Sequence, residues 1–208
     1  MNVIEDPTDF NPLSTLVFLT GDGRREFEVI KSLPKRYPRN KNLLVAKLPY
    51  SKSGTGLHAL KAVQTNLSHY KVRNTLCLVD KDSFTNRNPN PQSMERESRC
   101  AFNTYGVRVN NIRHINVGHE TVFVINGEIT GRGEVVIYLG IIGGEKCIEE
   151  DIAILIKLEL NENVEPDKHE IRALLRRHDI LLPTLIERAT INNLSQAFPA
   201  LHEITRTC

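Results

Sequence analysis

Residues 75–79, Thr75-Leu-Cys-Leu-Val79, form a continuous apolar run, and the triplet Asp80-Lys81-Asp82 follows it directly. An apolar run without polar alternation is typical of a strand that is buried on both faces, as in a parallel sheet. In open α/β sheets, ligands bind at the carboxyl ends of such strands. The two carboxylates are therefore candidate ligands for a metal ion, and hard Mg²⁺ favours carboxylate oxygens. The alternative is that Asp80 only caps a turn and that Asp82 is solvated.

Two more apolar segments and two helical patterns precede this run. Residues 16–20 and 43–48 are predicted strands, and the spacing of apolar residues predicts helices over 24–37 and 57–70. The β-α-β-α-β order of these segments predicts a mainly parallel, Rossmann-like sheet with right-handed crossovers. We therefore expect an α/β fold.

The second half of the chain adds an expected hairpin and several helices. A helix is predicted over 93–105, and Asn126-Gly127 predicts the turn of an inserted β-hairpin within 121–131. Further strands are expected from Val107 and over 135–142, before a helical remainder. We expect three parts in the chain, namely a flexible arm (1–13), an α/β domain (14–160) and a helical C-terminal appendage (161–208).

The composition is that of a globular protein. The chain has 208 residues, with 27 lysines and arginines, 25 aspartates and glutamates, and 40% hydrophobic residues. No apolar run approaches the roughly 20 residues that span a bilayer, and the acidic, polar N-terminus does not resemble a signal peptide. The cysteines form no CxxC pair, as expected of a reduced, cytoplasmic protein. We expect no membrane contact.

Positive charge is concentrated in one part of this nearly neutral chain. Residues 29 to 79 contain no aspartate or glutamate. Their basic residues are Lys31, Lys35, Arg36, Arg39, Lys41, Lys47, Lys52, Lys61, Lys71 and Arg73. A segment of one charge sign is typical of a surface that meets a polyanion, and phosphate is the usual one.

Glycine-rich turns precede both predicted helices of the first half. Thr20-Gly21-Asp22-Gly23 leads into Arg24 and Arg25, and Gly54-Thr55-Gly56 follows Lys52. Backbone N–H groups at the start of a helix can bind an anion. The first turn is not a dinucleotide-binding fingerprint, because Glu26 occupies the third glycine position. The candidate phosphate-binding residues are Gly21, Gly23, Arg24, Arg25 and Lys52, and plain strand-to-helix turns are the alternative.

Several charged groups in the second half have simpler interpretations. The acids of Glu145 to Glu150 open a helix, where the helix dipole alone favours them. His119-Glu120 and His169-Glu170 lack metal-ligand spacing. Arg172, Arg176 and Arg177 are typical of a solvated helix face, with nucleic-acid contact as the alternative.

Three segments together resemble motifs of the Toprim (topoisomerase–primase) fold family, particularly its compact members related to OLD-type nucleases. The segments are Phe18-Leu-Thr20-Gly21-Asp22-Gly-Arg-Arg-Glu26-Phe27, Leu78-Val-Asp80-Lys-Asp82 and Ile141-Ile-Gly-Gly144-Glu-Lys-Cys-Ile148-Glu149. In that family a first strand ends in Glu-Gly and a later strand ends in a metal-binding Asp-x-Asp pair. The similarity covers about residues 14 to 160. It implies a Toprim-like sheet with Mg²⁺, or Mn²⁺, at Asp80 and Asp82.

One departure from the family pattern bears on activity. The glutamate that the family uses in proton transfer falls on Thr20, whose hydroxyl cannot replace a carboxylate near neutral pH. Asp22 and Glu26 are the candidates to replace it. Lys81, together with Arg24 and Arg25, is the candidate to neutralise charge that develops on a phosphate.

The resemblance implies a protein that binds nucleic acid or a nucleotide phosphate and hydrolyses phosphodiesters with a metal ion. The alternative is a catalytically degenerate module that binds nucleic acid or a protein partner without turnover. Because the hairpin implies an exposed edge strand, to which a second copy of the chain could pair, we also predict a homodimer.

Overall fold

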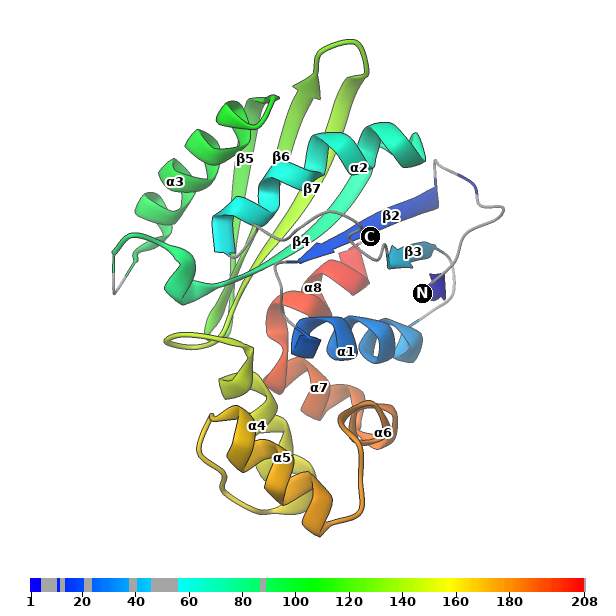
Figure 1. Cartoon of the computed structure of the whole chain (residues 1–208), viewed down its shortest axis with the longest axis vertical. Helices are drawn as coiled ribbons and strands as arrows, with labels where there is room; N and C mark the ends of the chain where they lie inside the picture. Colours follow the sequence, from blue (N-terminus) through cyan, green and yellow to red (C-terminus); the bar gives the residue numbers. More distant parts are fainter. Residues whose placement is uncertain are drawn as a thin grey trace.

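The computed structural model describes residues 1–4, 11, 14–20, 24–37, 41–45, 56–86 and 89–207. Within them, a seven-stranded sheet has the order β1-β3-β2-β4-β7-β6-β5 (Figure 1). The strands are β1 (Asn2–Ile4), β2 (Thr15–Thr20), β3 (Asn42–Val45), β4 (Asn74–Asp80), β5 (Val107–Val117), β6 (Glu120–Ile129) and β7 (Gly133–Ile142). The four neighbouring pairs β1–β3, β3–β2, β2–β4 and β4–β7 are parallel, and the two pairs β7–β6 and β6–β5 are antiparallel. The expected mainly parallel α/β sheet is confirmed.

Strand β4 lies in the middle of the sheet and is buried on both faces. It pairs in parallel with β2 on one side and with β7 on the other. Leu76 and Leu78 belong to the hydrophobic core on one face, whereas Cys77 and Val79 belong to the core on the other face. This double burial explains the unbroken apolar run in the sequence, because neither face of the strand meets water.

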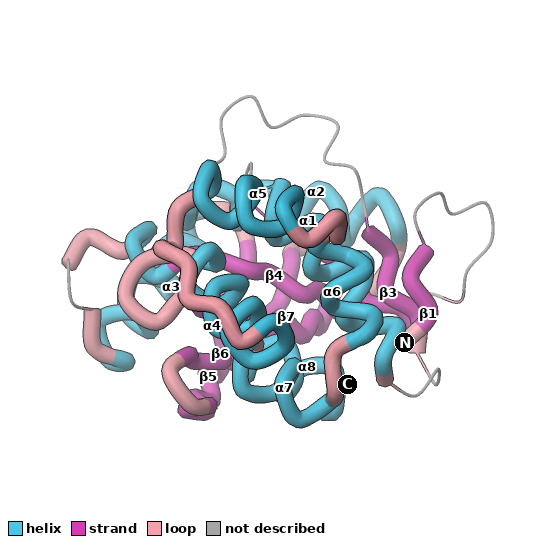
Figure 2. The backbone as a smooth tube through the Cα atoms, turned by 90° about the horizontal axis from the view of Figure 1, so that it is seen from below, coloured by secondary structure: helices cyan, strands magenta, loops and turns pink. Residues whose placement is uncertain are grey.

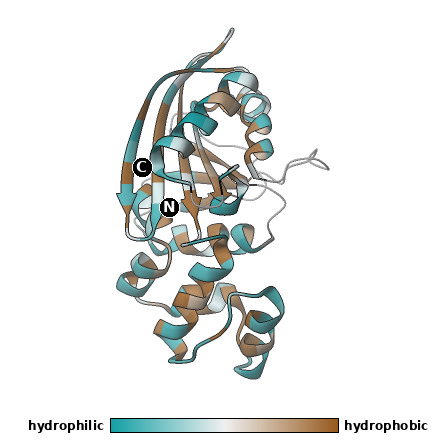
Figure 3. Ribbon diagram, turned by 90° about the vertical axis from the view of Figure 1, so that its left-hand side faces the viewer, coloured by the Kyte–Doolittle hydropathy of each residue, from teal (hydrophilic) through white to brown (hydrophobic). Residues whose placement is uncertain are grey.

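Helices cover both faces of the sheet, so that the strands lie between helical layers in Figure 2. The helices are α1 (Arg24–Ser32), α2 (Ala62–Tyr70), α3 (Pro91–Thr104), α4 (Ile148–Leu160), α5 (Lys168–Arg177), α6 (Leu182–Arg188), α7 (Ile191–Ala197) and α8 (Pro199–Thr207), with 3₁₀ turns η2 (Leu33–Arg36), η3 (Gly56–Lys61) and η4 (Lys81–Ser83). Helices α2 and α3 share one core with the sheet, and α1 and α8 share the other. Figure 3 shows hydrophobic residues on the strands and also on the helices, including those below the sheet. Among the described helices, none is long and apolar enough to cross a membrane.

The C-terminal helices that we expected are present, and the last of them packs directly on the sheet. Helices α4 to α7 lie below the sheet in Figure 1, whereas α8 returns to the sheet and packs on β6 and β7. A Cβ on Gly140 of β7 would lie 2.9 Å from Cδ2 of Leu78 on β4, whereas Ile204 and Ala200 of α8 would lie at ordinary contact distances of 3.5 and 3.8 Å. The glycine therefore makes room for the Leu78 side chain on the face of the sheet that α8 covers.

The start of the chain differs from the flexible arm that we predicted over 1–13. Residues Asn2–Ile4 form β1, which pairs in parallel with Asn42, Leu43 and Leu44 of β3. The Met1 side chain is only 2% exposed. A three-residue strand is too short to give a periodic pattern, so the sequence alone did not reveal it. Residues 5–10, 12 and 13 of the predicted arm lie outside the described residues.

The predicted turn at Asn126-Gly127 is wrong, because β6 runs without interruption through both residues. The β5–β6 connection is instead at Gly118 and His119, and the β6–β7 connection lies over 130–132. Gly127 pairs with Val109, next to a register shift in β5. A Cβ on Gly127 would lie 2.9 Å from the carbonyl oxygen of Arg108. Close approach of two backbones, rather than a turn, therefore explains this glycine.

We expect Gly127→Ala to lower the free energy of unfolding by about 1–3 kcal/mol, since the added methyl group must push β5 away. Urea denaturation monitored by circular dichroism measures the change. Gly131→Asn is the matched control, because a Cβ there would meet no atom within 4 Å and asparagine tolerates the positive φ of 76° at this position. Equal stability of the Gly127→Ala variant and the parent would contradict the close approach.

Candidate functional site

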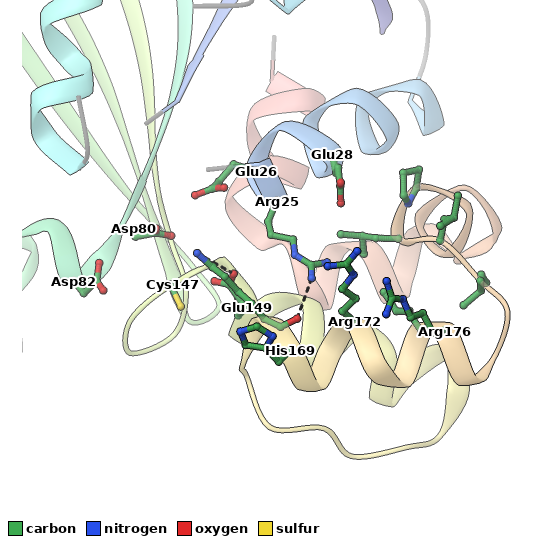
Figure 4. A pocket seen from close by; sticks show the side chains of 16 residues that line it. Arg25, Glu26, Glu28, Asp80, Asp82, Cys147, Glu149, His169, Arg172 and Arg176 are labelled. Carbon is green, nitrogen blue, oxygen red and sulfur yellow. Dashed lines mark hydrogen bonds and ion pairs between the residues drawn. The ribbon is translucent and has the colours of Figure 1, made fainter. Parts of the chain in front are cut away.

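A pocket of about 720 Å³ opens at the carboxyl end of β4, between the sheet and α5 (Figure 4). Its acidic lining residues are Glu26, Glu28, Asp80, Asp82 and Glu149. Its basic lining residues are Arg25, Lys168, His169, Arg172 and Arg176. The remaining lining is Cys147, Leu175, Ile180, Leu181, Leu182 and Pro183. The pocket thus joins the ends of β4 and of the β7–α4 loop with α1, α5 and the α5–α6 connection.

Three hydrogen bonds, each of which involves at least one backbone group, hold the end of β4 against the β7–α4 loop. The N–H of Asp82 donates to the carbonyl of Lys146 over 3.0 Å, and the N–H of Ile148 donates to Oδ1 of Asp80 over 3.1 Å. Nζ of Lys81 donates to the carbonyl of Gly144 over 2.6 Å. These three bonds fix where both aspartates emerge from the strand.

A glycine makes the β7–α4 loop possible. Gly143 has a φ of 80°, and a Cβ there would lie 2.4 Å from the backbone nitrogen of Cys147. Any larger residue would collide with the backbone of the same loop. The loop then starts α4 at Ile148 and brings Glu149 in its first turn to the pocket.

The acidic end of the pocket gathers three carboxylates, those of Glu26, Asp82 and Glu149, around Asp80. Burial, followed by the charge of Glu26, raises the pKa of Asp80 to about 7. This value includes the effect of the hydrogen bond from Ile148, which lowers the pKa, and of the charges of Asp82 and Glu149, which raise it. Like charges gathered in a partly buried place repel one another unless a cation neutralises them.

Glu149 has an unusual environment for a buried acid. Its side chain is 5% exposed, and Oε1 accepts no hydrogen bond from the residues that the structure describes. Nζ of Lys168 lies 3.9 Å from this oxygen, which is too far for a hydrogen bond. A buried carboxylate oxygen without a donor is costly. It is therefore a suitable ligand for a cation.

Helix α5 supplies the basic wall on the opposite side. Its N-cap Asp167 accepts hydrogen bonds from the N–H groups of His169 and Glu170, which fixes the first turn. A guanidinium nitrogen of Arg25 donates to the carbonyl of Lys168 over 3.3 Å, so α1 and α5 meet at this point. Figure 4 shows Glu26, Asp80 and Asp82 on one side and Arg172 and Arg176 on the other, with Arg25 between them.

The structure brings together some of the residues that the sequence suggested. Asp80, Asp82, Glu26 and Arg25 all line the pocket. Lys81 does not: its amine is bound to the Gly144 carbonyl, and its side chain lines a separate pocket of about 180 Å³ with His119 and Glu120. The structure therefore shows Lys81 supporting the loop, and its role in neutralising a phosphate stays a prediction.

Other predicted residues cannot be compared with the pocket. Gly21, Asp22, Gly23 and Lys52 lie outside the described residues. Arg24 is the first residue of α1, and only its backbone is described.

The basic segment over 29–79 does not form the wall of this pocket. None of its described lysines and arginines is among the lining residues. Lys71 and Arg73, for example, lie before β4, at the opposite end of the strand from Asp80. The cations of the pocket come instead from Arg25 and α5, where the sequence favoured a solvated face. The spacing of Lys168, Arg172 and Arg176 was the available signal, because residues four apart share one helix face.

A second cluster lies beside the pocket and was not apparent in the sequence. Ligand-type atoms of His119, Glu120 and Asp151 lie within 4.8 Å of one another. Nε2 of His119 is 2.9 Å from Oδ1 of Asp151, and the N–H of Ala200 donates to Oε2 of Glu120 over 2.7 Å. The N–H of Gly143 donates to Oδ2 of Asp151 over 3.0 Å.

These contacts join the start of β6, the β7–α4 loop and the start of α8. Burial raises the pKa of Asp151 to about 8 and raises the pKa of Glu120 well above its usual value. The residue types suit a metal ion, but backbone donors already occupy carboxylate oxygens of both acids. We interpret the cluster as a clamp that stabilises the loop behind the pocket. The sequence separation of 32 between His119 and Asp151 explains why no sequence motif marked the cluster.

Comparisons of this chain with protein-family models, with curated proteins and with solved structures found no match.

We expect the stability of Glu120→Gln to depend less on pH than that of the parent. Because burial raises the pKa of Glu120, its protonated form favours folding. That stabilisation is present below the unfolded pKa and is lost as the pH rises through the folded pKa. Melting temperatures between about pH 5 and pH 8 should therefore fall more in the parent than in the variant. The exposed Glu134 provides the control variant Glu134→Gln, which should follow the parent; parallel curves for all three proteins would contradict the clamp.

Proposed function

We propose that this chain binds a divalent cation at the acidic end of the pocket and hydrolyses phosphodiester bonds in nucleic acid or a nucleotide. The observation that carries this proposal is the separation of charge within one pocket. Carboxylates from α1, β4, η4 and α4 face basic side chains from α1 and α5 (Figure 4). A cation at one end and a phosphate at the other would neutralise both sets of charges.

The carboxylates have two chemical properties expected of a site for Mg²⁺ or Mn²⁺, whereas the only group of three or more described side chains whose ligand atoms all lie within 4.8 Å of one another is that of His119, Glu120 and Asp151. Glu149 offers a buried oxygen without a donor, and neighbouring acids contribute to the raised pKa of Asp80. Asp80, Asp82 and Glu149 are the residues that would hold the ion, because hard cations take carboxylate oxygens. When bound, the ion supplies Lewis-acid polarisation of a phosphate.

The protein's own side chains have separate roles in this proposal. Arg25 and Arg172 bind phosphate oxygens, since guanidinium groups match phosphate geometry. Glu26, which is buried beside Asp80, is the carboxylate for proton transfer in place of Thr20. This arrangement is what a Toprim-like protein with a shifted first glutamate would have, and the family assignment is part of the proposal.

A test of the metal site uses Asp80→Asn and Glu149→Gln. In Asp80→Asn, the asparagine keeps an oxygen that can accept from the N–H of Ile148. Both variants remove one of several acids that repel one another, and both should therefore fold without metal at the parent's melting temperature or above it. We expect Mn²⁺ at ~100 times its dissociation constant to raise the melting temperature of the parent by about 5–10 °C and that of either variant much less. Glu187→Gln, on an exposed position of α6, is the matched control.

The same proteins are then assayed for hydrolysis of bis(p-nitrophenyl) phosphate and of labelled DNA and RNA. Hydrolysis by the parent that requires Mn²⁺ or Mg²⁺ and is lost in Asp80→Asn supports the proposal. Binding of nucleic acid without hydrolysis under any divalent cation would instead favour the degenerate binding module. Equal Mn²⁺ stabilisation of the parent and both variants would refute the assigned ligands.

A further inference from the structure

We propose that the basic wall of the pocket is a track for a single strand of nucleic acid, with phosphates along α5 and an unstacked base against Leu181. This inference rests on the proposed function, because the track leads to the acidic cluster. It adds the class of substrate, which neither the charge separation nor the carboxylates define.

The cations on α5 form one regular stripe. Lys168, Arg172 and Arg176 are four residues apart, and all three are exposed and line the pocket. With a rise of 1.5 Å per residue, the stripe is about 12 Å long. Arg25 lies at the head of the stripe, bound to the carbonyl of Lys168. A stripe of this length can follow several successive phosphates of one strand.

The two arginines of the stripe are available to an external anion. Within the described part of the chain, neither Arg172 nor Arg176 forms an ion pair with an acidic side chain. Arg177, their neighbour on the same helix, does pair with Glu162 at 2.7 Å and lines a different pocket. The helix therefore directs its unpaired guanidinium groups to the pocket that contains the acidic cluster.

An apolar surface adjoins the end of this stripe. The α5–α6 connection contributes Ile180 and Leu181, and α6 begins with Leu182 and Pro183. The side chain of Leu181 is 72% exposed, far more than the other large hydrophobic residues that remain exposed in the described chain. Leucine side chains can contact and wedge between the faces of nucleobases. Leu181 is thus placed where a base adjacent to an α5-bound phosphate would lie.

These features favour a single strand over a duplex. In a duplex, Leu181 could contact the face of a base only by unstacking a base step, which costs free energy, whereas the bases of a single strand are accessible without that cost. A duplex also presents two backbones, whereas the pocket offers one stripe of cations. A mononucleotide would use only one end of a track about 12 Å long.

The direction of the track explains how a metal ion and the strand would cooperate. Phosphates on α5 need no metal ion, because arginine and lysine neutralise them. A phosphate that moves from Arg25 towards Asp80 meets carboxylates, which repel it until a divalent cation is bound. Strand binding on the track is therefore separable from hydrolysis.

The test measures binding to the full chain by fluorescence anisotropy, in EDTA so that no hydrolysis occurs. The probes are fluorescein-labelled DNA and RNA strands of about 12 nucleotides and the corresponding blunt duplexes. We expect the parent to bind the single strands at least about tenfold more tightly than the duplexes. Comparison of DNA with RNA identifies which of the two strands the track prefers.

Two variants examine the two parts of the track. Arg172→Gln combined with Arg176→Gln should weaken strand binding and reduce the slope of log affinity against log salt by about 1.4, since each phosphate contact contributes about 0.7. Arg177→Gln, from the same helix, should leave the slope unchanged. Leu181→Ala should reduce the preference for single strands, whereas Leu158→Ala, at an exposed leucine of α4, should not.

Equal or tighter binding of duplexes by the parent overturns the inference, and so does an unchanged salt slope in the double arginine variant. Competition by a 5′-mononucleotide as effective as that by the strand also overturns it. Metal-dependent hydrolysis of bis(p-nitrophenyl) phosphate by a protein without strand preference would leave the proposed function intact. Strand binding in EDTA without hydrolysis in Mn²⁺ would leave the track intact and refute the catalytic proposal.

Discussion

The contact between the end of β4 and the β7–α4 loop is the constraint on which the pocket depends. Parallel pairing places Asp80 beside Ile142, the last residue of β7. The Lys81 amine and the backbone of Asp82 then hold the loop through the carbonyls of Gly144 and Lys146. Since these bonds join the two residues that follow Asp80 to two carbonyls of the loop, the aspartates and α4 keep a defined position relative to each other.

Acidic and basic residues that are interspersed along the sequence lie on different sides of the pocket in the folded protein. Acids at strand and helix ends gather on one side because parallel strands all end at the same edge of the sheet. Apart from Arg25 of α1, the cations come from α5, a helix that lies below the sheet rather than on it (Figure 1). Gathering buried acids destabilises a protein unless a ligand compensates them. Their presence in an accessible pocket is thus more informative about function than the overall charge of +2.

Sequence reasoning succeeded where a local pattern reflects burial and failed where a residue serves a distant contact. The apolar run before Asp80 identified the central strand, since a strand inside a parallel sheet has no polar face. Asn126-Gly127 has the composition of a turn, yet Gly127 is needed for close approach to Arg108 across the sheet. The α5 arginines looked solvated, because their relation to the pocket depends on how the C-terminal helices return to the sheet.

By itself the sequence determined the α/β class, the central strand and the position of Asp80 and Asp82 at the end of that strand. It could do so because the spacing of apolar residues, which reflects burial, is a property of short segments. Only the tertiary structure decided that Glu26 and Glu149 join these aspartates, that Lys81 supports a loop, and that α5 rather than the basic segment over 29–79 faces them. Those relations join residues far apart in the chain. They follow from strand order and helix packing, for which no local pattern exists.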